Sequence, residues 1–521
     1  MVESGHNFRK ALATAFVAAL FAVCFLPGCS SDIEEPVEVA ATVPSLTPPE
    51  IAREFRGVWI PTVANLSWPS KPGLSIADQQ AELLALLDEA LELNQNAVIL
   101  QVRPACDAFY LSDIEPWSEY LTGKQGQGPL PFYDPLEFAV TEAHQRGLEL
   151  HAWFNPYRVR SLKITAPAAD SHVSKRHPEW VRTYGSLLWL DPGLPEVQDY
   201  TLQVVLDVVQ RYDIDAVHFD DYFYPYPEKD KKGKYLDFPD NLSWEKFGKE
   251  TGLIRSDWRR RNVDEFVHKV YREIHDVKPQ IKFGISPFGI WRPGHPDTIA
   301  GLDAYEALYA DARKWLREGW CDYLAPQLYW PINDPPTSYP ILLDWWTGQS
   351  LLDRHVFPGL NALKVLDGWP VAEISRQIEF TRTQPRAGGQ ILWSVNAYRD
   401  KKAFKDELAG EVYTEPALSP RFEWLDSTPP ATPTLSMNVA DNGYEATWSA
   451  LGDEEAWLWV VQTLERGEWK TSILPRGETS FRFVSTIEGV AVTSVDRSGN
   501  TSLPAVLEVE SGESRDQGAD R

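Results

Sequence analysis

The chain has 521 residues, of which 43% are hydrophobic and 12% aromatic, which predicts several folded domains and excludes disorder throughout. Asp and Glu outnumber Lys and Arg 75 to 50, and the net charge of −25 disfavours nucleic acid as a partner because phosphate backbones are repelled. The four Cys form no CxxC pair, and the ten His include no HExxH motif. We therefore predict no metal ion and no other cofactor.

The first 28 residues have the pattern of a secretory signal peptide. Arg9 and Lys10 precede an apolar run at 11–27, which is shorter than the roughly 20 residues of a membrane helix. An N-terminal membrane anchor that stays uncleaved is the alternative interpretation.

The end of this run resembles a bacterial lipobox, Leu26-Pro27-Gly28-Cys29. The resemblance implies cleavage before Cys29 and lipidation of Cys29, so that acyl chains alone hold the protein on a membrane. Residues 29–52 continue with an acidic, Pro-rich stretch and predict a flexible stalk. We expect a lipid-anchored lipoprotein of the cell envelope that faces the periplasm at the outer membrane.

Strand and helix patterns alternate over residues 53–427. The eight expected strands are 55–60, 96–102, 148–154, 216–221, 281–287, 323–329, 356–361 and 390–395. The main expected helices are 76–93, 135–146, 195–211, 258–277, 304–318 and 371–383. This alternation predicts an α/β fold, a (β/α)8 barrel with long loops after its strands. A doubly wound open sheet is the alternative, although no glycine-rich phosphate loop follows any expected strand.

The sequence changes character after Ser427. A Pro-rich linker leads into short segments of alternating hydrophobicity at 444–448, 457–464, 480–484 and 490–495. We predict an all-β sandwich over 428–510 and a disordered tail at 511–521. The segment from Val490 to Ser502 resembles the end of a fibronectin type III domain.

The loops at the carboxyl ends of barrel strands carry the chemistry of barrel enzymes. At these positions the chain has many aromatic rings and amides and few charges. Such a surface suits sugars, because aromatic faces stack on sugar C–H groups and amides bond to hydroxyls. The expected substrate-binding residues are Trp59, Arg103, Asp107, Trp153, Asn155, Tyr157, Arg158, His218, Tyr222, Tyr224, Gln327, Tyr329, Trp330, Asn361 and Asn396. The expected partner is a polysaccharide.

Several of these residues have a structural alternative. Any single tryptophan could fill the core of a large domain. His218 shares strand parity with Asp220 and could be a buried hydrogen-bonding partner inside the barrel. Arg103 and Arg158 could brace neighbouring carboxylates or bind an anionic group on the ligand.

Asp220 and Asp221 end the fourth expected strand and are the expected catalytic carboxyl groups, with a helix cap or ion pair as the alternative. Glycosidases commonly use two carboxyl groups, and adjacent strand residues can cooperate only where the strand turns. Asn361 stands where a seventh-strand nucleophile would be, which disfavours a retaining scheme that uses one. Three schemes remain: Asp107 partners a fourth-strand acid, the two aspartates divide the roles, or the substrate's own 2-acetamido oxygen attacks.

Five sequence blocks in order resemble the glycosyl hydrolase-like ten family. They are FRGVW from Phe55, QVRP from Gln101, HAWFNPYR from His151, HFDDYFYP from His218 together with Asp215, and APQLYW from Ala325. The resemblance covers about 53–398 and implies a (β/α)8 barrel in a bacterial envelope lipoprotein. It implies hydrolysis of peptidoglycan glycan strands that lack stem peptides, with Asp220 and Asp221 as the catalytic carboxylates.

The fourth-strand block also resembles the DxxDxDxE signature of family eighteen chitinases. His218 and Tyr222 occupy its second acidic and catalytic Glu positions, so that mechanism cannot be carried over.

We therefore expect a lipid-anchored glycoside hydrolase that acts on strands of N-acetylglucosamine and N-acetylmuramic acid without stem peptides. Arg103 or Arg158 would recognise the lactyl carboxylate of the muramic residues. Two alternatives remain: a non-catalytic glycan-binding envelope lipoprotein, and a glycosidase of an imported neutral polysaccharide.

Overall fold

The computed structural model of the chain describes residues 46–440, 443–452, 455–483 and 487–509. The predicted signal peptide (1–28), lipidated Cys29, most of the predicted stalk and the predicted tail at 511–521 lie outside these residues. Among the described residues, every helix is too short or too polar to cross a membrane.

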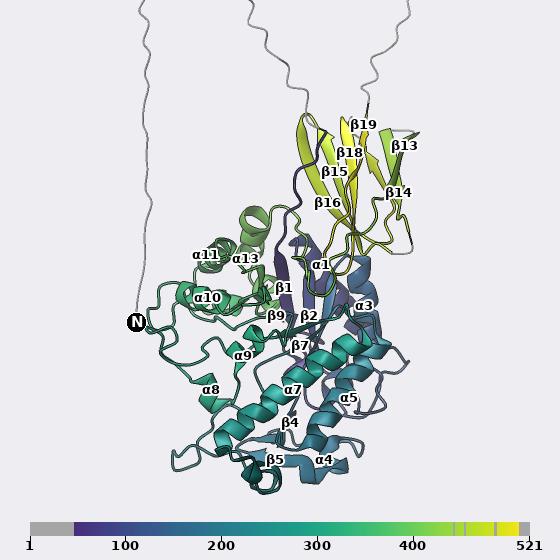
Figure 1. The fold of residues 1–521 in the computed structure, drawn as a ribbon. Helices are drawn as coiled ribbons and strands as arrows, with labels where there is room; N and C mark the ends of the chain where they lie inside the picture. Colours follow the sequence, from purple (N-terminus) through teal and green to yellow (C-terminus); the bar gives the residue numbers. More distant parts are fainter. Residues whose placement is uncertain (1–45, 441–442, 453–454, 484–486, 510–521) are drawn as a thin grey trace, which may run out of the picture. The chain divides into compact units, whose positions relative to one another are not determined.

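In the part of the chain that the structure describes, nine parallel strand segments form the central sheet, in the order β10-β9-β8-β7-β3-β2-β1-β12-β11. Figure 1 labels β1, β2, β7 and β9 of this sheet. The bounds of the nine segments are β1 Phe55–Ile60, β2 Ala97–Arg103, β3 Glu149–Phe154, β7 Ala216–Phe219, β8 Lys282–Ile285, β9 Tyr323–Leu324, β10 His355–Val356, β11 Gly359–Leu360 and β12 Gly389–Leu392. The two end segments, β10 and β11, are separated in sequence only by Phe357 and Pro358. They are two halves of one strand, so the sheet closes into a barrel of eight strands. The predicted (β/α)8 barrel is confirmed, and the open sheet is excluded.

Helices follow the strands around the barrel, among them α5 and α7 in Figure 1. The longer ones are α1 Ile76–Glu92, α3 Pro135–Gln145, α5 Pro195–Arg211, α7 Arg255–Val277, α10 Tyr339–Thr347 and α11 Val371–Arg382. Helix α3 begins at Pro135, behind Asp134, whose carboxylate accepts from the backbone N–H of Leu136. Shorter helices are α2 Glu119–Thr122, α4 Val173–Arg176, α6 Asn241–Ser243, α8 Ala304–Ala307, α9 Ala312–Arg317, α12 Asn396–Arg399 and α13 Lys402–Glu407.

The prediction of one continuous helix at 304–318 is wrong. It is divided into α8 and α9, and Tyr309 between them has a φ of 53°, which a continuous right-handed helix cannot contain. The expected strand at 323–329 is also shorter, because β9 ends at Leu324. Residues 325–329 of the expected strand are not in a regular strand, and they include the site residues Gln327 and Tyr329.

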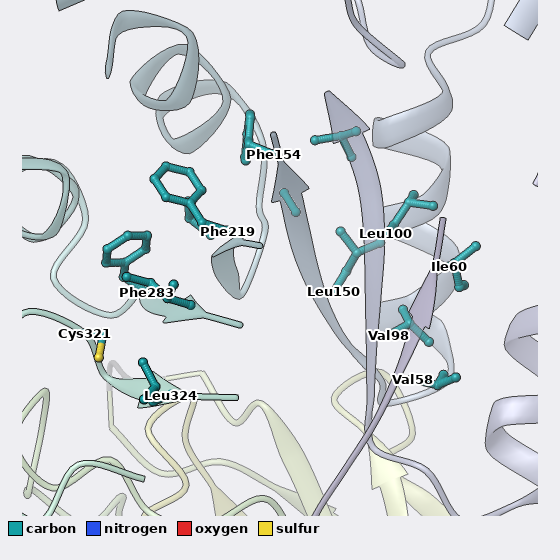
Figure 2. Packing of buried hydrophobic residues seen from close by; sticks show 14 of the residues in the cluster. Val58, Ile60, Val98, Leu100, Leu150, Phe154, Phe219, Phe283, Cys321 and Leu324 are labelled. Atoms are coloured by element: carbon teal, nitrogen blue, oxygen red, sulfur yellow. The ribbon is translucent and has the colours of Figure 1, made fainter. Parts of the chain in front are cut away.

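Alternate side chains of the strands enter two different layers. Val58, Val98 and Leu150 belong to the large apolar cluster that includes residues of the surrounding helices (Figure 2). Trp59 and Ile99 belong to a second cluster, which lies inside the barrel. Strand side chains alternate with a period of two. The odd positions of a strand therefore lie in one layer and its even positions in the other. The same rule places His218 and Asp220 on the interior side.

A three-stranded antiparallel sheet, which the sequence analysis did not predict, is inserted after β3. It contains β4 Arg158–Ser161, β5 Val181–Tyr184 and β6 Leu187–Leu190, in the order β4-β6-β5. This insertion begins four residues after the end of β3, so it belongs to the loops at the carboxyl end of the barrel.

Among the residues described after the linker, seven antiparallel strands form two sheets, one ordered β13-β14-β17 and another ordered β16-β15-β18-β19. They are β13 Thr434–Ala440, β14 Gly443–Ser449, β15 Leu458–Glu465, β16 Glu468–Pro475, β17 Ser480–Phe483, β18 Gly489–Val495 and β19 Ala505–Glu508. Both sheets contribute to one apolar cluster, with Trp448 from β14 and Trp459 from β15. The predicted all-β sandwich is confirmed, whereas its likeness to fibronectin type III stays a prediction.

The sandwich contacts the amino-terminal end of the barrel through Arg497. This guanidinium forms ion pairs with Asp213 at 2.6 Å and Asp215 at 3.1 Å, and it lies 4.8 Å from the centre of the Trp457 ring. Together with His144, Arg497 lowers the pKa of Asp215. Residues 46–52, part of the predicted stalk, also lie against the sandwich, where Gln462 donates to the Pro49 carbonyl at 3.1 Å.

Candidate active site

Asp220 and Asp221 lie at the carboxyl end of β7, just where the strand stops at Phe219. Their exposed fractions are 5% and 2%, so both carboxyl groups are nearly removed from water. Asp220 Oδ2 accepts hydrogen bonds from the indole N–H of Trp153, at 3.2 Å, and from the side-chain amide of Asn155. The donors come from β3 and the residue just after it, next to β7 in the barrel.

Asp221 is held by a different set of donors. Its Oδ2 accepts from the Tyr226 hydroxyl, and the side chain of Gln327 also favours the ionised form of Asp221 and so lowers its pKa. Gln327 is fixed in turn, because its Nε2 donates to the Ser286 carbonyl at 3.0 Å. In an extended strand, neighbouring side chains point to opposite faces. Here β7 has ended at Phe219 and the chain bends at Asp221, so the two neighbouring aspartates can act at one site.

Burial raises the pKa of both carboxyl groups. The pKa of Asp220 rises to about 7, mainly through desolvation, with repulsion from Asp221 adding to the rise and Arg158 opposing it. The pKa of Asp221 rises to about 6, again mainly through desolvation, and the Tyr226 hydrogen bond opposes this rise. Near neutral pH, the pair therefore holds about one proton, the condition that an acid with an ionised partner requires.

Three tryptophans surround this end of the barrel. Trp393 packs edge-on against Trp59 and Trp153, with ring centres 6.0 Å apart in both pairs. Trp393 is half-buried, whereas the other two are 2% and 5% exposed. Gly359 permits this packing, since a Cβ there would lie 2.9 Å from the Trp59 ring and 3.4 Å from the Tyr329 ring.

A chain of hydrogen bonds runs from Trp59 through the barrel interior. The Trp59 indole donates to His218 Nε2 at 3.2 Å, so His218 carries its proton on Nδ1 and donates to the Tyr323 hydroxyl at 2.9 Å. Tyr323 then donates to His151 Nδ1 at 2.8 Å, and His151 Nε2 donates to Glu149 at 2.9 Å. Burial lowers the pKa of His218 well below its usual value. His218 is therefore a neutral support for Trp59.

Arg158 supports the donor of Asp220. Its Nη2 donates to Asn155 Oδ1 at 2.6 Å and its Nε donates to the Pro104 carbonyl at 2.8 Å. The guanidinium lies 5.3 Å from the centre of the Tyr222 ring. Since Asn155 Oδ1 accepts from Arg158, the Asn155 amide group is oriented toward Asp220.

Arg103 is not placed to bind substrate, which corrects its expected role. It is fully buried, and it forms a two-point ion pair with Glu115 at 2.8 and 2.5 Å. It also donates to the carbonyls of Asn155 and Pro156. A register shift between Gln101 and Arg103 interrupts the pairing of β2, and such a bulge redirects the side chain that follows it.

Three more expected binding residues are structural. Asp107 is fully buried and accepts from the backbone of Ala105 and the side chain of Gln125, so it does not serve as partner of the pair. Tyr157 is fully buried, 5.2 Å from the Phe266 ring of α7. Tyr224 is 1% exposed and packs between Phe238 and Tyr309.

The remaining expected residues lie at strand ends. Burial raises the pKa of Tyr329 well above its usual value, and the charges of Asp221 and Asp220 add to this rise. Asn361 is half-buried after β11, and its Oδ1 has no hydrogen bond to another described residue. Asn396 donates to the Leu66 carbonyl at 2.8 Å.

Tyr226 and Tyr323 are site residues that the sequence prediction did not include. Tyr226 follows Asp221 by five positions, and only the conformation of the loop brings its hydroxyl back to that carboxylate. Trp393 directly follows β12, at the end of the expected eighth strand. Among the described residues, no group of three or more His, Cys, Asp or Glu side chains could hold a metal ion.

A (β/α)8 barrel with two buried carboxyl groups at the end of one strand, framed by tryptophans, is the arrangement of a glycoside hydrolase. The comparison with protein families agrees. The chain belongs to the Glycosyl hydrolase-like 10 family, whose model matches residues 54–371.

Two curated relatives extend this finding. The chain is 42% identical over 414 residues to "Glycosyl hydrolase YngK" of Bacillus subtilis, covering 77% of this chain and 80% of the relative. It is 36% identical over 411 residues to "Glycosyl hydrolase DigH" of Escherichia coli K12, covering 73% and 89%. A solved structure of the PgaB glycoside hydrolase domain from Bordetella bronchiseptica matches with 15% identity and a TM-score of 0.46, covering 69% of this chain and 99% of that chain.

Replacing Arg103 with Gln should destabilise the protein by about 3–5 kcal/mol, because the Glu115 charge would remain buried without its partner. Urea unfolding measures this loss. As a matched control, Arg103→Met combined with Glu115→Leu should lose less stability than the single change. An Arg103→Gln variant as stable to urea as the wild type would contradict the structural role of the Arg103–Glu115 ion pair.

Replacing Asp220 with Asn should reduce the pH dependence of stability. The pKa of Asp220 in the folded protein is about 7, above its usual value of 3.8. The proton bound to Asp220 therefore stabilises the folded protein fully below about pH 4, and this stabilisation is lost as the pH rises through about 7. Between about pH 5 and about pH 8, the melting temperature of the wild type should fall relative to that of Asp220→Asn in calorimetry.

The exposed residue Asp297 supplies the control for this measurement. Asp297→Asn should follow the wild type at each pH. A melting-temperature difference between wild type and Asp220→Asn that stays constant with pH would contradict the raised pKa.

Proposed function

We propose that this glycoside hydrolase cleaves peptidoglycan glycan strands that lack stem peptides, and that a lipid on Cys29 holds it in the cell envelope. The Asp220–Asp221 pair carries the catalytic part of the proposal, because it offers one protonated and one ionised carboxyl group side by side. The substrate class follows from the family resemblance and from the chemistry of the surrounding groups.

Asp220 is the general acid in this scheme. Its pKa is raised further than that of Asp221, so it keeps the shared proton at higher pH. It donates this proton to the departing glycosidic oxygen. Asp221 stays ionised, supported by the Tyr226 hydroxyl and the Gln327 amide.

The substrate's 2-acetamido oxygen supplies the nucleophile. The described end of the seventh strand offers Asn361 rather than a carboxylate, and Asp107 is bonded within its own loop. Attack of the acetamido oxygen on the anomeric carbon breaks the bond to the leaving sugar, and Asp221 orients the amide N–H. Water then opens the cyclic intermediate and returns a proton to Asp220.

Arg158 is the candidate for recognising the lactyl carboxylate of a muramic residue. Its Nε and Nη2 are bonded within the protein, whereas Nη1 has no hydrogen bond to another described residue. The side chain is half-buried beside Tyr222, so one face of the guanidinium is already shielded. A carboxylate at Nη1 would gain a charge-assisted hydrogen bond.

Asp220→Asn and Asp221→Asn test the catalytic assignment. Each variant should release sugars from denuded glycan strands roughly 100-fold more slowly than wild type, because a positioned acid or base contributes at least that much. Chromatography of the released oligosaccharides measures the rate, with Asp297→Asn as the active control. Undiminished release by both variants would contradict the assignment.

The substrate control is a panel of neutral polysaccharides without acetamido groups. Wild-type cleavage of these polymers in preference to denuded strands would favour a glycosidase of imported polysaccharide. Tight binding of denuded strands without new reducing ends would favour a glycan-binding lipoprotein.

Replacing Cys29 with Ser tests the lipid anchor, because serine cannot form the thioether to the lipid. We expect the wild-type protein in the membrane fraction of an expressing bacterium and the Cys29→Ser protein in the soluble periplasmic fraction. Detergent release of the wild type serves as the control. A wild-type protein that carries no lipid in mass spectrometry would contradict the proposal.

A further inference from the structure

Four aromatic rings form a continuous row beside Asp221. The Tyr222 and Tyr226 ring centres are 5.6 Å apart, those of Tyr226 and Phe288 are 6.2 Å apart, and those of Phe288 and Trp330 are 5.6 Å apart. Each pair meets edge to face, so successive rings turn their faces in different directions. The row extends across the loops that follow β7, β8 and β9.

All four rings are half-buried, so each retains some exposed surface. The row is joined to the catalytic pair through its second member, because the Tyr226 hydroxyl donates to Asp221. A second connection runs through Gln327, whose amide contacts Asp221 and whose backbone forms a bridge with Phe288. The row of rings and the catalytic pair are therefore neighbours.

Trp330, at the far end of the row, is held in place. A Cβ on Gly289 would lie 2.9 Å from the Trp330 ring and 2.2 Å from the Gln327 carbonyl, so only glycine permits this close packing. The Trp330 carbonyl also accepts from the Gln377 amide at 3.1 Å. The ring is thus positioned before any ligand arrives, which reduces the entropy lost on binding.

A different aromatic group serves Asp220. Trp153 donates to its carboxylate and packs against Trp393, from β3 and from the end of β12. The two carboxyl groups therefore accept hydrogen bonds from different aromatic groups. Asp220 accepts from Trp153 of the tryptophan group, and Asp221 accepts from Tyr226 of the row of four rings.

We propose that the row Tyr222–Tyr226–Phe288–Trp330 is an extended subsite that binds further sugar units of the glycan, beyond the two that flank the cleaved bond. The proposal rests on the proposed function and names a binding segment for the same substrate. The four side chains are aromatic and uncharged, so they suit the C–H faces of pyranose rings and not the carboxylate of a muramic residue.

Two consequences follow from this subsite. Affinity should increase with chain length until the row is covered. Cleavage should occur within chains, because sugars are bound at both groups of rings.

Binding to the Asp220→Asn variant tests the subsite without requiring hydrolysis. Isothermal titration with β-1,4-linked N-acetylglucosamine oligomers, from the dimer to the hexamer, should show affinity that rises with length. Adding Phe288→Ala and Trp330→Ala should weaken the hexamer about tenfold, the effect of about 1.4 kcal/mol, and leave the dimer unchanged.

The control is Phe132→Ala in the same background, since Phe132 is a surface phenylalanine with 62% of its area exposed and an edge-on contact to Trp117. It should bind every oligomer as the parent does. Trp330→Phe should restore part of the hexamer affinity, because a ring face remains.

The outcomes separate the two proposals. Equal hexamer affinity with and without Phe288 and Trp330, in variants whose melting temperatures match the parent, would overturn the subsite. Length-dependent binding that these two substitutions abolish would support it, even if the wild type cleaved no glycan and the proposed catalytic function failed.

Discussion

Two carboxyl groups removed from water at the end of one strand are the constraint on which this site depends. A buried carboxylate is costly unless it is hydrogen-bonded, and here the donors are Trp153 and Asn155 for Asp220, and Tyr226 for Asp221. These donors limit the rise of pKa that burial causes. The result is a pair that exchanges one proton near neutral pH, as acid catalysis requires.

The barrel supplies the supports of this pair in layers. Asn155 is oriented by Arg158, and Trp59 is oriented by neutral His218. Below them, the hydrogen bonds continue through Tyr323 to residues at the amino-terminal end of the strands. The reacting groups directly follow β7, where the strand ends at Phe219, and the aromatic row lies on the loops after β7, β8 and β9.

Strand parity explains how much the sequence could predict. The period of two predicted that His218 and Asp220 lie on the interior side, and the hydrogen bond of His218 to Trp59, inside the barrel, agrees. The alternation of strands and helices was also sufficient to predict the barrel, because eight strand patterns followed by helices fit few other folds.

The same rule failed where the backbone departs from a regular strand. A bulge in β2 turns Arg103 toward Glu115, and no local pattern announces it. The return of Tyr226 to Asp221 depends on the conformation of a loop, and the packing of Trp393 on Trp59 depends on contacts between distant strands. These contacts follow from tertiary structure, which single-sequence patterns do not contain.

A crystal structure of the Asp221→Asn variant with a bound β-1,4-linked N-acetylglucosamine oligomer tests the central claim most directly. The account predicts the glycosidic oxygen within hydrogen-bonding distance of Asp220, with sugar rings on the tryptophans at one side and toward Tyr226 at the other. An oligomer bound elsewhere, with Asp220 still sealed beneath Trp153 and Asn155, would contradict it.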